Sequence, residues 1–219
     1  MMQSTFHVLS FALSTLTTLF FVVDPPACAT LFLTMTARDA PAHRRRTATR
    51  AALVAVLTLA SFAAAGGLIF RLLGVSLGAF RIAGGILLFL LAADMLRAQR
   101  SRQRTTPEEE AEGIDKGDVS VFPLGIPMLA GPGATSTVMV LMSRAEHAWQ
   151  MLIVFASIAV TGVATYWILR GAVGLERRLG RTGMNVMQRV MGLILAATAM
   201  QFVVEGVETV LPSMAAALR

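Results

Sequence analysis

Charge and cysteine are both scarce in this sequence. Only 15% of the 219 residues are charged, and Cys28 is the single cysteine. One cysteine excludes an internal disulfide and a cysteine-based metal cluster. The composition is 55% hydrophobic with a mean hydropathy of +0.67, which is more apolar surface than a soluble domain needs, because its outer layer must face water. The sequence therefore predicts an integral membrane protein.

The charges that are present are mostly arginines between apolar runs. The net charge of +6 could suggest nucleic acid, but no amphipathic face gathers it, so we expect no nucleic-acid binding. The first residues, MMQSTFHVLS, contain no Lys or Arg, so we expect the first helix to be retained rather than cleaved as a signal peptide. The three histidines have no ligand spacing, and we expect no metal ion or cofactor.

Six apolar runs are long enough to cross a bilayer, since about 20 residues span its hydrocarbon core. We expect helices, because backbone polar groups in lipid must pair within their own segment or in a closed barrel. The six predicted spans are 6–35 (interrupted), 50–70, 78–96, 119–142 (interrupted), 150–170 and 190–211.

The arginines also predict an orientation. The loops after spans 1, 3 and 5 hold 15 of the Lys and Arg residues, and the other side holds 4. Cytoplasmic loops carry the excess of positive charge, so the predicted arrangement has both termini outside the cytoplasm.

The two halves of the chain resemble each other. DPPACATLFLTMT begins at residue 24 and GPGATSTVMVLMS begins 107 residues later, while RIAGGILL at 81 matches RVMGLILA at 189. Three spans in each half place the second half upside down relative to the first, as in many secondary transporters. We therefore predict an all-α membrane protein of two inverted three-helix repeats, 1–97 and 119–219, with a polar cytoplasmic linker at 98–118.

The first span of each repeat contains a break, at DPP in one half and at GPG in the other. Pro25 and Pro132 suit the first position of a new helix, whose free N–H groups favour anions. In an inverted repeat, the two new helix starts would meet near the membrane midplane. A shallower re-entrant arrangement on the cytoplasmic side stays open.

The two helix starts differ in chemistry. Asp24 can cap its own helix and offers negative charge to an ammonium group or a coupling cation, whereas Gly131 and Gly133 leave amides open for a carboxylate. The predicted substrate is a zwitterion such as a neutral amino acid. The expected binding residues are Asp24, Pro25, Thr30, Gly131, Pro132, Gly133, Thr135 and Ser136. In the alternative interpretation, Asp24 is only a helix cap and the glycines only allow close packing.

Other polar residues in the spans receive structural interpretations. We expect Asp94 to pair with Arg97 near the interface and Arg81 to extend toward lipid headgroups. We expect Glu205 to reach the external surface, with a role in transport as the alternative. An intramembrane enzyme using Asp24 and Asp94 would need the two carboxylates close together. Asp94 is expected nearer the interface, so we expect no enzyme and no catalytic residue.

The motifs VVDPPACATLFLTMT, FPLGIPMLAGPGATSTVM and RVMGLILAATAMQFVVEG resemble the MarC family of bacterial inner-membrane proteins, from Phe6 to about Val207. The resemblance implies a multi-pass protein of the bacterial inner membrane, and the arginine distribution then predicts that both termini are periplasmic. That family is similar to exporters of the LysE type and to neutral amino-acid transporters, which agrees with a zwitterionic substrate. The chain has Ala27, Cys28 and Ala29 where relatives can carry Ser or Asn. A non-transporting membrane protein, linked to the envelope or to stress, is the alternative.

Overall fold

The computed structural model describes residues 2–37, 39–97 and 119–217, and every element within them is helical. The predicted linker at 98–118 lies outside the described residues. The elements are α1 (Met2–Val23), α2 (Pro25–Met35), α3 (Pro41–Leu73), α4 (Leu77–Leu96), the irregular turns of η1 (Ser120–Leu129), α6 (Pro132–Ser143), α7 (Ala148–Arg170) and α8 (Ala172–Ala217).

The helices have the length and composition of membrane spans. Five segments of the described chain are long and apolar enough to cross a bilayer, with α1 and α2 together forming one of them. The pair η1 and α6 passes the same test across a bend of 56° and gives a sixth span if it is counted as one. The predicted all-helical membrane fold is confirmed at this level.

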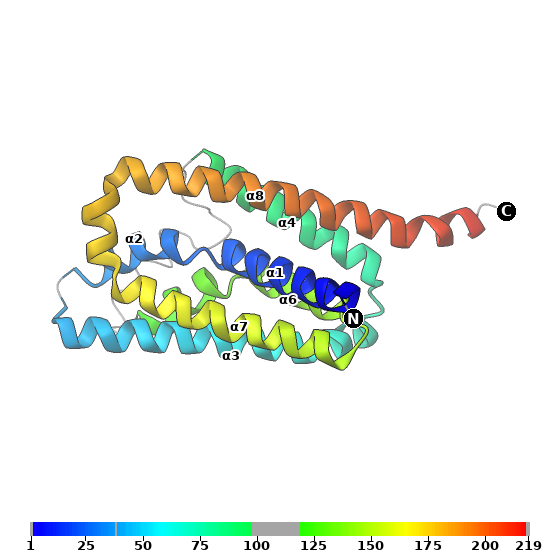
Figure 1. The fold of residues 1–219 in the computed structure, drawn as a ribbon, viewed down its shortest axis with the longest axis horizontal. Coiled ribbons are helices and arrows are strands. Elements are labelled where there is room, and N and C mark those ends of the chain that lie inside the picture. The colour runs from blue at the N-terminus through cyan, green and yellow to red at the C-terminus, as the bar shows by residue number, and fades with distance from the viewer. Residues whose placement is uncertain (1, 38, 98–118, 218–219) are drawn as a thin grey trace.

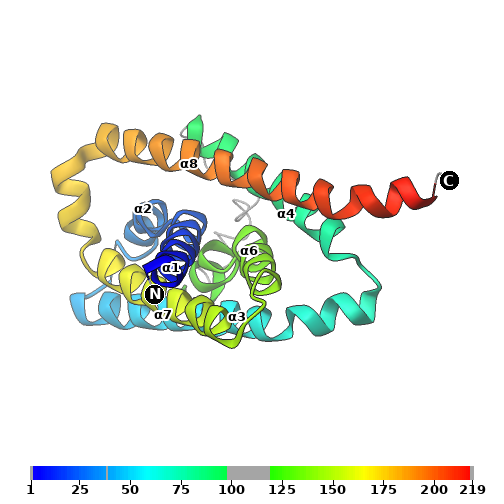
Figure 2. The ribbon, with the colours of Figure 1, turned by 45° about the vertical axis from the view of Figure 1, so that its right-hand side comes forward.

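The helices form three layers (Figures 1 and 2). Helix α4 packs along α8 on one side, and α3 packs along α7 on the other. The interrupted elements α1, α2 and α6 lie between these two pairs. The breaks in the chain are therefore covered by whole helices, as irregular backbone inside a membrane requires.

The two halves of the sequence interlock in this arrangement. The broken elements of the first half, α1 and α2, contact α7 and α8 of the second half. The broken elements of the second half, η1 and α6, contact α3 of the first half, and α6 also contacts α4. Each half therefore buries its broken span against the whole helices of the other half.

Close packing of α4 on α8 depends on small residues. A Cβ atom on Gly85 would lie 2.7 Å from the carbonyl oxygen of Ala199, and one on Gly206 would lie 2.8 Å from that of Gly78. Such distances leave no room for a side chain between the two backbones. Small residues are the usual means by which helices approach closely in membranes, because apolar attraction is weak where lipid is also apolar.

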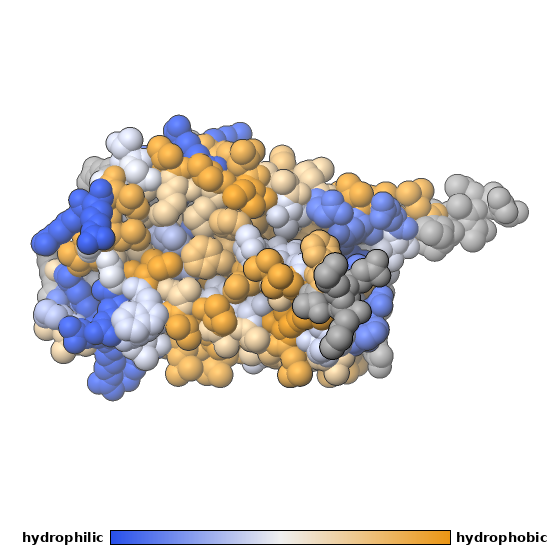
Figure 3. Space-filling view, viewed as in Figure 1, coloured by the Kyte–Doolittle hydropathy of each residue, from blue (hydrophilic) through white to orange (hydrophobic). Residues whose placement is uncertain are grey.

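One end of the molecule is hydrophilic (Figure 3), and we call it the arginine-rich end because it holds Arg44, Arg45, Arg46, Arg170, Arg177 and Arg178. The start of α3, the end of α7 and the start of α8 meet there, and the start of α1 and the end of α8 lie at the opposite end (Figure 1). At Gly180, which has a φ of +61°, the chain changes direction between the short first segment of α8 and the long span that follows. This backbone conformation is strained for residues with a side chain.

The segment before GPG is not the regular helix expected for the first part of the interrupted span 119–142. Phe122 and Ile126 have extended backbone angles, and each precedes a proline through a cis peptide bond. A proline disfavours the helical conformation of the residue before it and removes a backbone donor. The motif FPLGIP therefore forms two wide turns, with Leu124 N–H donating to Val119 and Ala130 N–H to Gly125.

Candidate functional site

The first helix start in the site is that of α2, which Asp24 begins. Its backbone is left-handed (φ 49°, ψ 61°), and its Oδ1 accepts a hydrogen bond from the N–H of Ala27 at 3.3 Å. Asp tolerates this conformation better than most residues and is a preferred N-cap. Only 1% of Asp24 is exposed, so its carboxyl group lies inside the protein at the break between α1 and α2.

The break at Asp24 is nevertheless mild. The N–H of Asp24 still donates to Phe20, and the N–H of Cys28 donates to Asp24. Residues 6–35 pass as one continuous span. The left-handed residue therefore interrupts the helix locally without ending the hydrogen-bond pattern around it.

The second helix start is that of α6, and no side chain caps it within the described residues. Gly131 is extended there, and Pro132 occupies the first helical position. The N–H of Thr135 bonds to the carbonyl of Gly131. The first-turn amides of Gly133 and Ala134 precede that bond and lack an intrahelical partner, as at any helix start. The start of α6 thus offers two amides and the positive end of the helix dipole, whereas the start of α2 has the carboxylate of Asp24.

A small cavity opens at this uncapped start. Val22 from α1, Leu91 from α4 and Met128 from η1 line it together with residues 131–134. Its volume of about 20 Å³ is enough for about one water molecule. Small-molecule pockets in proteins typically have volumes of about 300–1,000 Å³. The described conformation is therefore closed to a solute the size of an amino acid.

The structure brings some of the predicted site residues together and separates others. Gly131, Pro132 and Gly133 line the cavity, and Val22 beside them lies two residues before Asp24. The side chains of Thr30, Thr135 and Ser136 instead donate hydrogen bonds to carbonyl groups of their own helix segments. Pro25 is buried at the first position of α2.

The two glycines of GPG have different surroundings. A Cβ atom on Gly131 would lie 2.3 Å from the carbonyl oxygen of Pro127, so only glycine fits there. A Cβ atom on Gly133 would lie 3.5 Å or more from Leu88, Leu91 and Val22, which is ordinary contact. Packing explains the first glycine, as the alternative interpretation expects, but packing does not explain the second.

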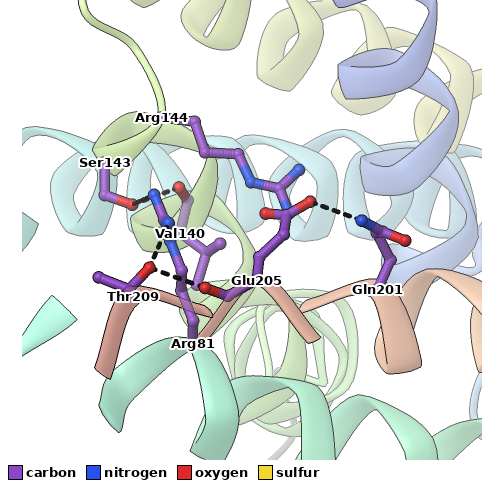
Figure 4. A network of polar contacts seen from close by, with 7 residues as sticks. All are labelled: Arg81, Val140, Ser143, Arg144, Gln201, Glu205 and Thr209. Carbon is purple, nitrogen blue, oxygen red and sulfur yellow. Dashed lines mark hydrogen bonds and ion pairs between the residues drawn. The ribbon is translucent and has the colours of Figure 1, made fainter. Parts of the chain in front are cut away.

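A polar cluster lies at the other end of α6 and joins it to α4 and α8 (Figure 4). The Arg144 guanidinium forms an ion pair with Glu205 and lies over the ring of Phe202, 4.5 Å from its centroid. Glu205 also accepts a hydrogen bond from Gln201 at 3.1 Å. About a quarter of each side chain of the ion pair is exposed, so water and salt screen the pair only partly.

A second arginine adds positive charge to this cluster. The guanidinium of Arg81 reaches Ser143 at 3.5 Å and Thr209 at 3.4 Å, while the Nε atoms of Arg81 and Arg144 are buried without a hydrogen-bond partner. Burial lowers the pKa of Arg144 from its ordinary value, Glu205 acts in the opposite direction, and Arg81 lowers it further. The cluster therefore contains two guanidinium groups, of which Arg144 forms the ion pair with Glu205 and Arg81 contacts the hydroxyl groups.

Sequence reasoning missed this cluster. From the sequence, Glu205 is expected at the external surface and Arg81 at the headgroups, and Arg144 is one of the four positive charges on the side with fewer of them. The available signal was the position of Arg144 directly after the second motif, on the turn where α6 ends. Its partner on α8 could not be identified without the packing of α4, α6 and α8.

Two further expectations concern acidic residues and metals. The expected ion pair between Asp94 and Arg97 does not occur within 4.0 Å among the described residues, whereas His43 pairs with Asp39 and Arg144 with Glu205. No group of three His, Cys, Asp or Glu side chains suited to a metal ion occurs among residues 2–37, 39–97 and 119–217.

Comparison with known proteins gives a consistent result. Residues 9–211 match the model described as the MarC family integral membrane protein. The chain is 36% identical to a UPF0056 membrane protein of Archaeoglobus fulgidus over 210 residues, covering 94% of this chain and 96% of the relative. It is 36% identical to YvbG of Bacillus subtilis, covering 93% and 97%. It is 33% identical to YhcE of Escherichia coli, covering 90% and 91%. No solved structure matches the chain.

Proposed function

The chain belongs to the MarC family of integral membrane proteins, and from this premise we propose that it is a secondary transporter of a small zwitterionic solute, such as a neutral amino acid. The observation that carries the proposal is the pairing of two unlike helix starts inside the span region. One is capped by the buried carboxylate of Asp24, and the other is uncapped at a cavity. The uncapped amides of α6 would hold the carboxylate of the solute, and Asp24 its ammonium group or a coupling cation.

The helix packing supports the inverted repeat that such a transporter would use. The packed pairs α3 with α7 and α4 with α8 are equivalent elements of the two halves. Within the second pair, a Cβ atom on Gly85 would meet the carbonyl of Ala199, and one on Gly192 would meet the carbonyl of Ala92. Each helix of this pair therefore places a glycine close to a carbonyl group of the other helix, which agrees with a two-fold axis between the repeats.

In this proposal, the described conformation is the closed state of the transport cycle. The cavity at Gly133 is too small for the solute, so binding requires α6 to move relative to α1 and α4. The ion pair of Arg144 with Glu205 connects the C-terminal end of α6 to α8. We assign it the role of a gate, an interaction that must break before the solute can enter. Following the arginine distribution, the arginine-rich end faces the bacterial cytoplasm and the gate faces the periplasm.

Counterflow in proteoliposomes tests the proposal. Vesicles loaded with one unlabelled neutral amino acid at a time should accumulate its radiolabelled form when they contain the parent protein. Asp24→Asn should abolish accumulation, because it removes the charge while keeping a good helix cap. Asp94→Asn is the matched control and should transport like the parent, since Asp94 contacts neither motif among the interactions described.

The outcomes separate the two candidate functions. Transport by Asp24→Asn at the parental rate would disprove the assigned site. A parent protein that accumulates no neutral amino acid, and that is not stabilised by any of them in thermal unfolding, would favour a non-transporting membrane protein.

A further inference from the structure

We propose that the arginine-rich end holds a specific site for the phosphate headgroup of an anionic glycerophospholipid. The site is a cavity of about 250 Å³ between the end of α2, the start of α3 and the corner between α7 and α8. It is independent of the proposed transport function, because it shares no residue with the cavity at the α6 start.

Three arginine residues line this cavity. Arg44 and Arg45 reach it from α3, and Arg170 reaches it from the last residue of α7. Arginine suits phosphate because its planar fork of N–H groups can donate two parallel hydrogen bonds. Basic pockets between membrane helices at the cytoplasmic side are typical binding sites for anionic headgroups.

The arginines are held in place and keep N–H groups for a ligand. The Nε and Nη2 atoms of Arg44 donate to the carbonyls of Thr36 and Ala37 at the end of α2, which fixes its plane and leaves Nη1 available. Arg170 donates from Nη1 to the hydroxyl of Tyr166 and keeps its other nitrogens. In the described chain, no carboxylate forms an ion pair with Arg44, Arg45 or Arg170. Asp39, the nearby acid, contacts His43 instead.

The rest of the cavity wall is apolar. Phe32 and Leu33 from α2 face Leu169 and Val173 from the α7–α8 corner. A free phosphate ion gains nothing from such a wall, whereas the glycerol backbone and the first acyl carbons of a lipid bury apolar surface against it. The combination of guanidinium groups and an apolar wall therefore favours a lipid over a soluble anion.

The depth of the cavity agrees with a headgroup. The first span ends at Met35, the second begins at Pro41, and α7 ends at Arg170, so the cavity lies where three spans leave the apolar layer. Trp167 is 58% exposed, and the Arg170 guanidinium lies 5.1 Å from its ring centroid. Exposed tryptophan is typical of the level of the headgroups. Figure 3 shows the apolar surface of the spans meeting the hydrophilic end in this region.

Native mass spectrometry of the full chain in detergent tests the proposal, with phosphatidylglycerol, phosphatidylcholine and inorganic phosphate as separate probes. The parent should retain phosphatidylglycerol in preference to phosphatidylcholine. The double variant Arg45→Gln/Arg170→Gln should lose affinity for phosphatidylglycerol about thirtyfold, from two arginine contacts. Both side chains are exposed, so the variant should fold, which a monodisperse elution profile and the thermal midpoint would check.

The matched control is Arg46→Gln/Arg177→Gln, which removes the same charge from two exposed residues at the same end but outside this cavity. It should lose less than about threefold, because surface attraction is weak and screened. Equal losses in both double variants would overturn the proposal in favour of general surface attraction. Equal retention of both lipids by the parent, or inorganic phosphate displacing phosphatidylglycerol at equal concentration, would also overturn it.

Discussion

At the scale of single residues, the two breaks illustrate how local chemistry produces unequal helix starts. Asp24 supplies its own cap and adopts a left-handed backbone, which few residues with a side chain do. Gly131 has an extended backbone that any residue could adopt, and its requirement for glycine comes from the carbonyl of Pro127. The break at DPP is therefore determined by residues adjacent in sequence, and the break at GPG by the fold of FPLGIP before it.

The two glycines of GPG should respond differently to alanine. Gly131→Ala places Cβ 2.3 Å from the Pro127 oxygen, and overpacking of this kind costs about 1–3 kcal/mol. Gly133→Ala meets only ordinary contacts, so the free energy of unfolding should stay within about 0.5 kcal/mol of the parent or rise slightly. Denaturant unfolding in detergent measures both values.

Gly133→Ala also tests the assigned role of the cavity. The added methyl group should lower the rate of counterflow at unchanged stability, because it occupies space beside the open amides. A stable Gly133→Ala variant that transports like the parent would argue against a ligand at the start of α6.

At the scale of the element, close backbone approach decides the pairing of α4 with α8. A Cβ atom on Gly85 would lie 2.7 Å from the carbonyl oxygen of Ala199. A Cβ atom on the adjacent Gly84 would have Ser136 of α6 as its nearest neighbour, at 3.6 Å. Neighbouring residues on a helix point about 100° apart, so one faces the tight interface and the other a looser one.

This difference provides a matched pair of variants. Gly85→Ala should destabilise the protein by about 1–3 kcal/mol, because the backbone of α8 must move away. Gly84→Ala should be neutral or slightly stabilising, since alanine is the better helix former and space is available. Equal thermal midpoints for the two variants would contradict the proposed close contact.

A second feature at this scale is the ion pair of Arg144 with Glu205, which connects α6 to α8. Removing Glu205 leaves the Arg144 and Arg81 guanidinium groups facing each other without a counter-charge. Removing one partner of a buried ion pair lowers the free energy of unfolding more than replacing both partners does. The partial exposure of this pair reduces the effect.

A double-mutant cycle measures the interaction free energy of this ion pair. Glu205→Gln and Arg144→Gln should each destabilise the protein, with a coupling free energy of about 1–2 kcal/mol in the combined variant. The cycle requires only unfolding data for the parent, the two single variants and the double variant. Additive losses would show that the pair does not connect the helices energetically.

At the scale of the whole molecule, the described helices form an interlocked bundle with one arginine-rich end and with the start of α1 and the end of α8 at the other (Figures 1 and 3). Each half covers the broken span of the other half, so neither half buries its irregular backbone alone. The halves should therefore unfold together rather than as two separate domains.

Cysteine labelling tests the proposed orientation. Cys28 is fully buried, so it should not react with an impermeant maleimide in intact cells. Glu146→Cys lies on the exposed turn between α6 and α7 and should be labelled, whereas Arg177→Cys at the arginine-rich end should react only after the cells are opened. The reverse pattern would show that the termini face the cytoplasm.

The sequence by itself determined the class of the protein, the approximate spans and the places of the two breaks. Those features depend on composition and on Pro, Gly and Asp at particular positions, and a residue's neighbours in sequence are sufficient to predict them. The cap formed by Asp24 belongs to this group, because donor and acceptor are three residues apart.

Only the tertiary structure decided which residues meet across the bundle. The Arg144–Glu205 ion pair, the cavity walls and the contrast between Gly131 and Gly133 all depend on the rotation and depth of helices far apart in sequence. In a membrane, nearly every helix face is apolar, so hydrophobic periodicity does not indicate which face packs inward. Close packing of small residues sets those contacts, and that packing exists only in the assembled fold.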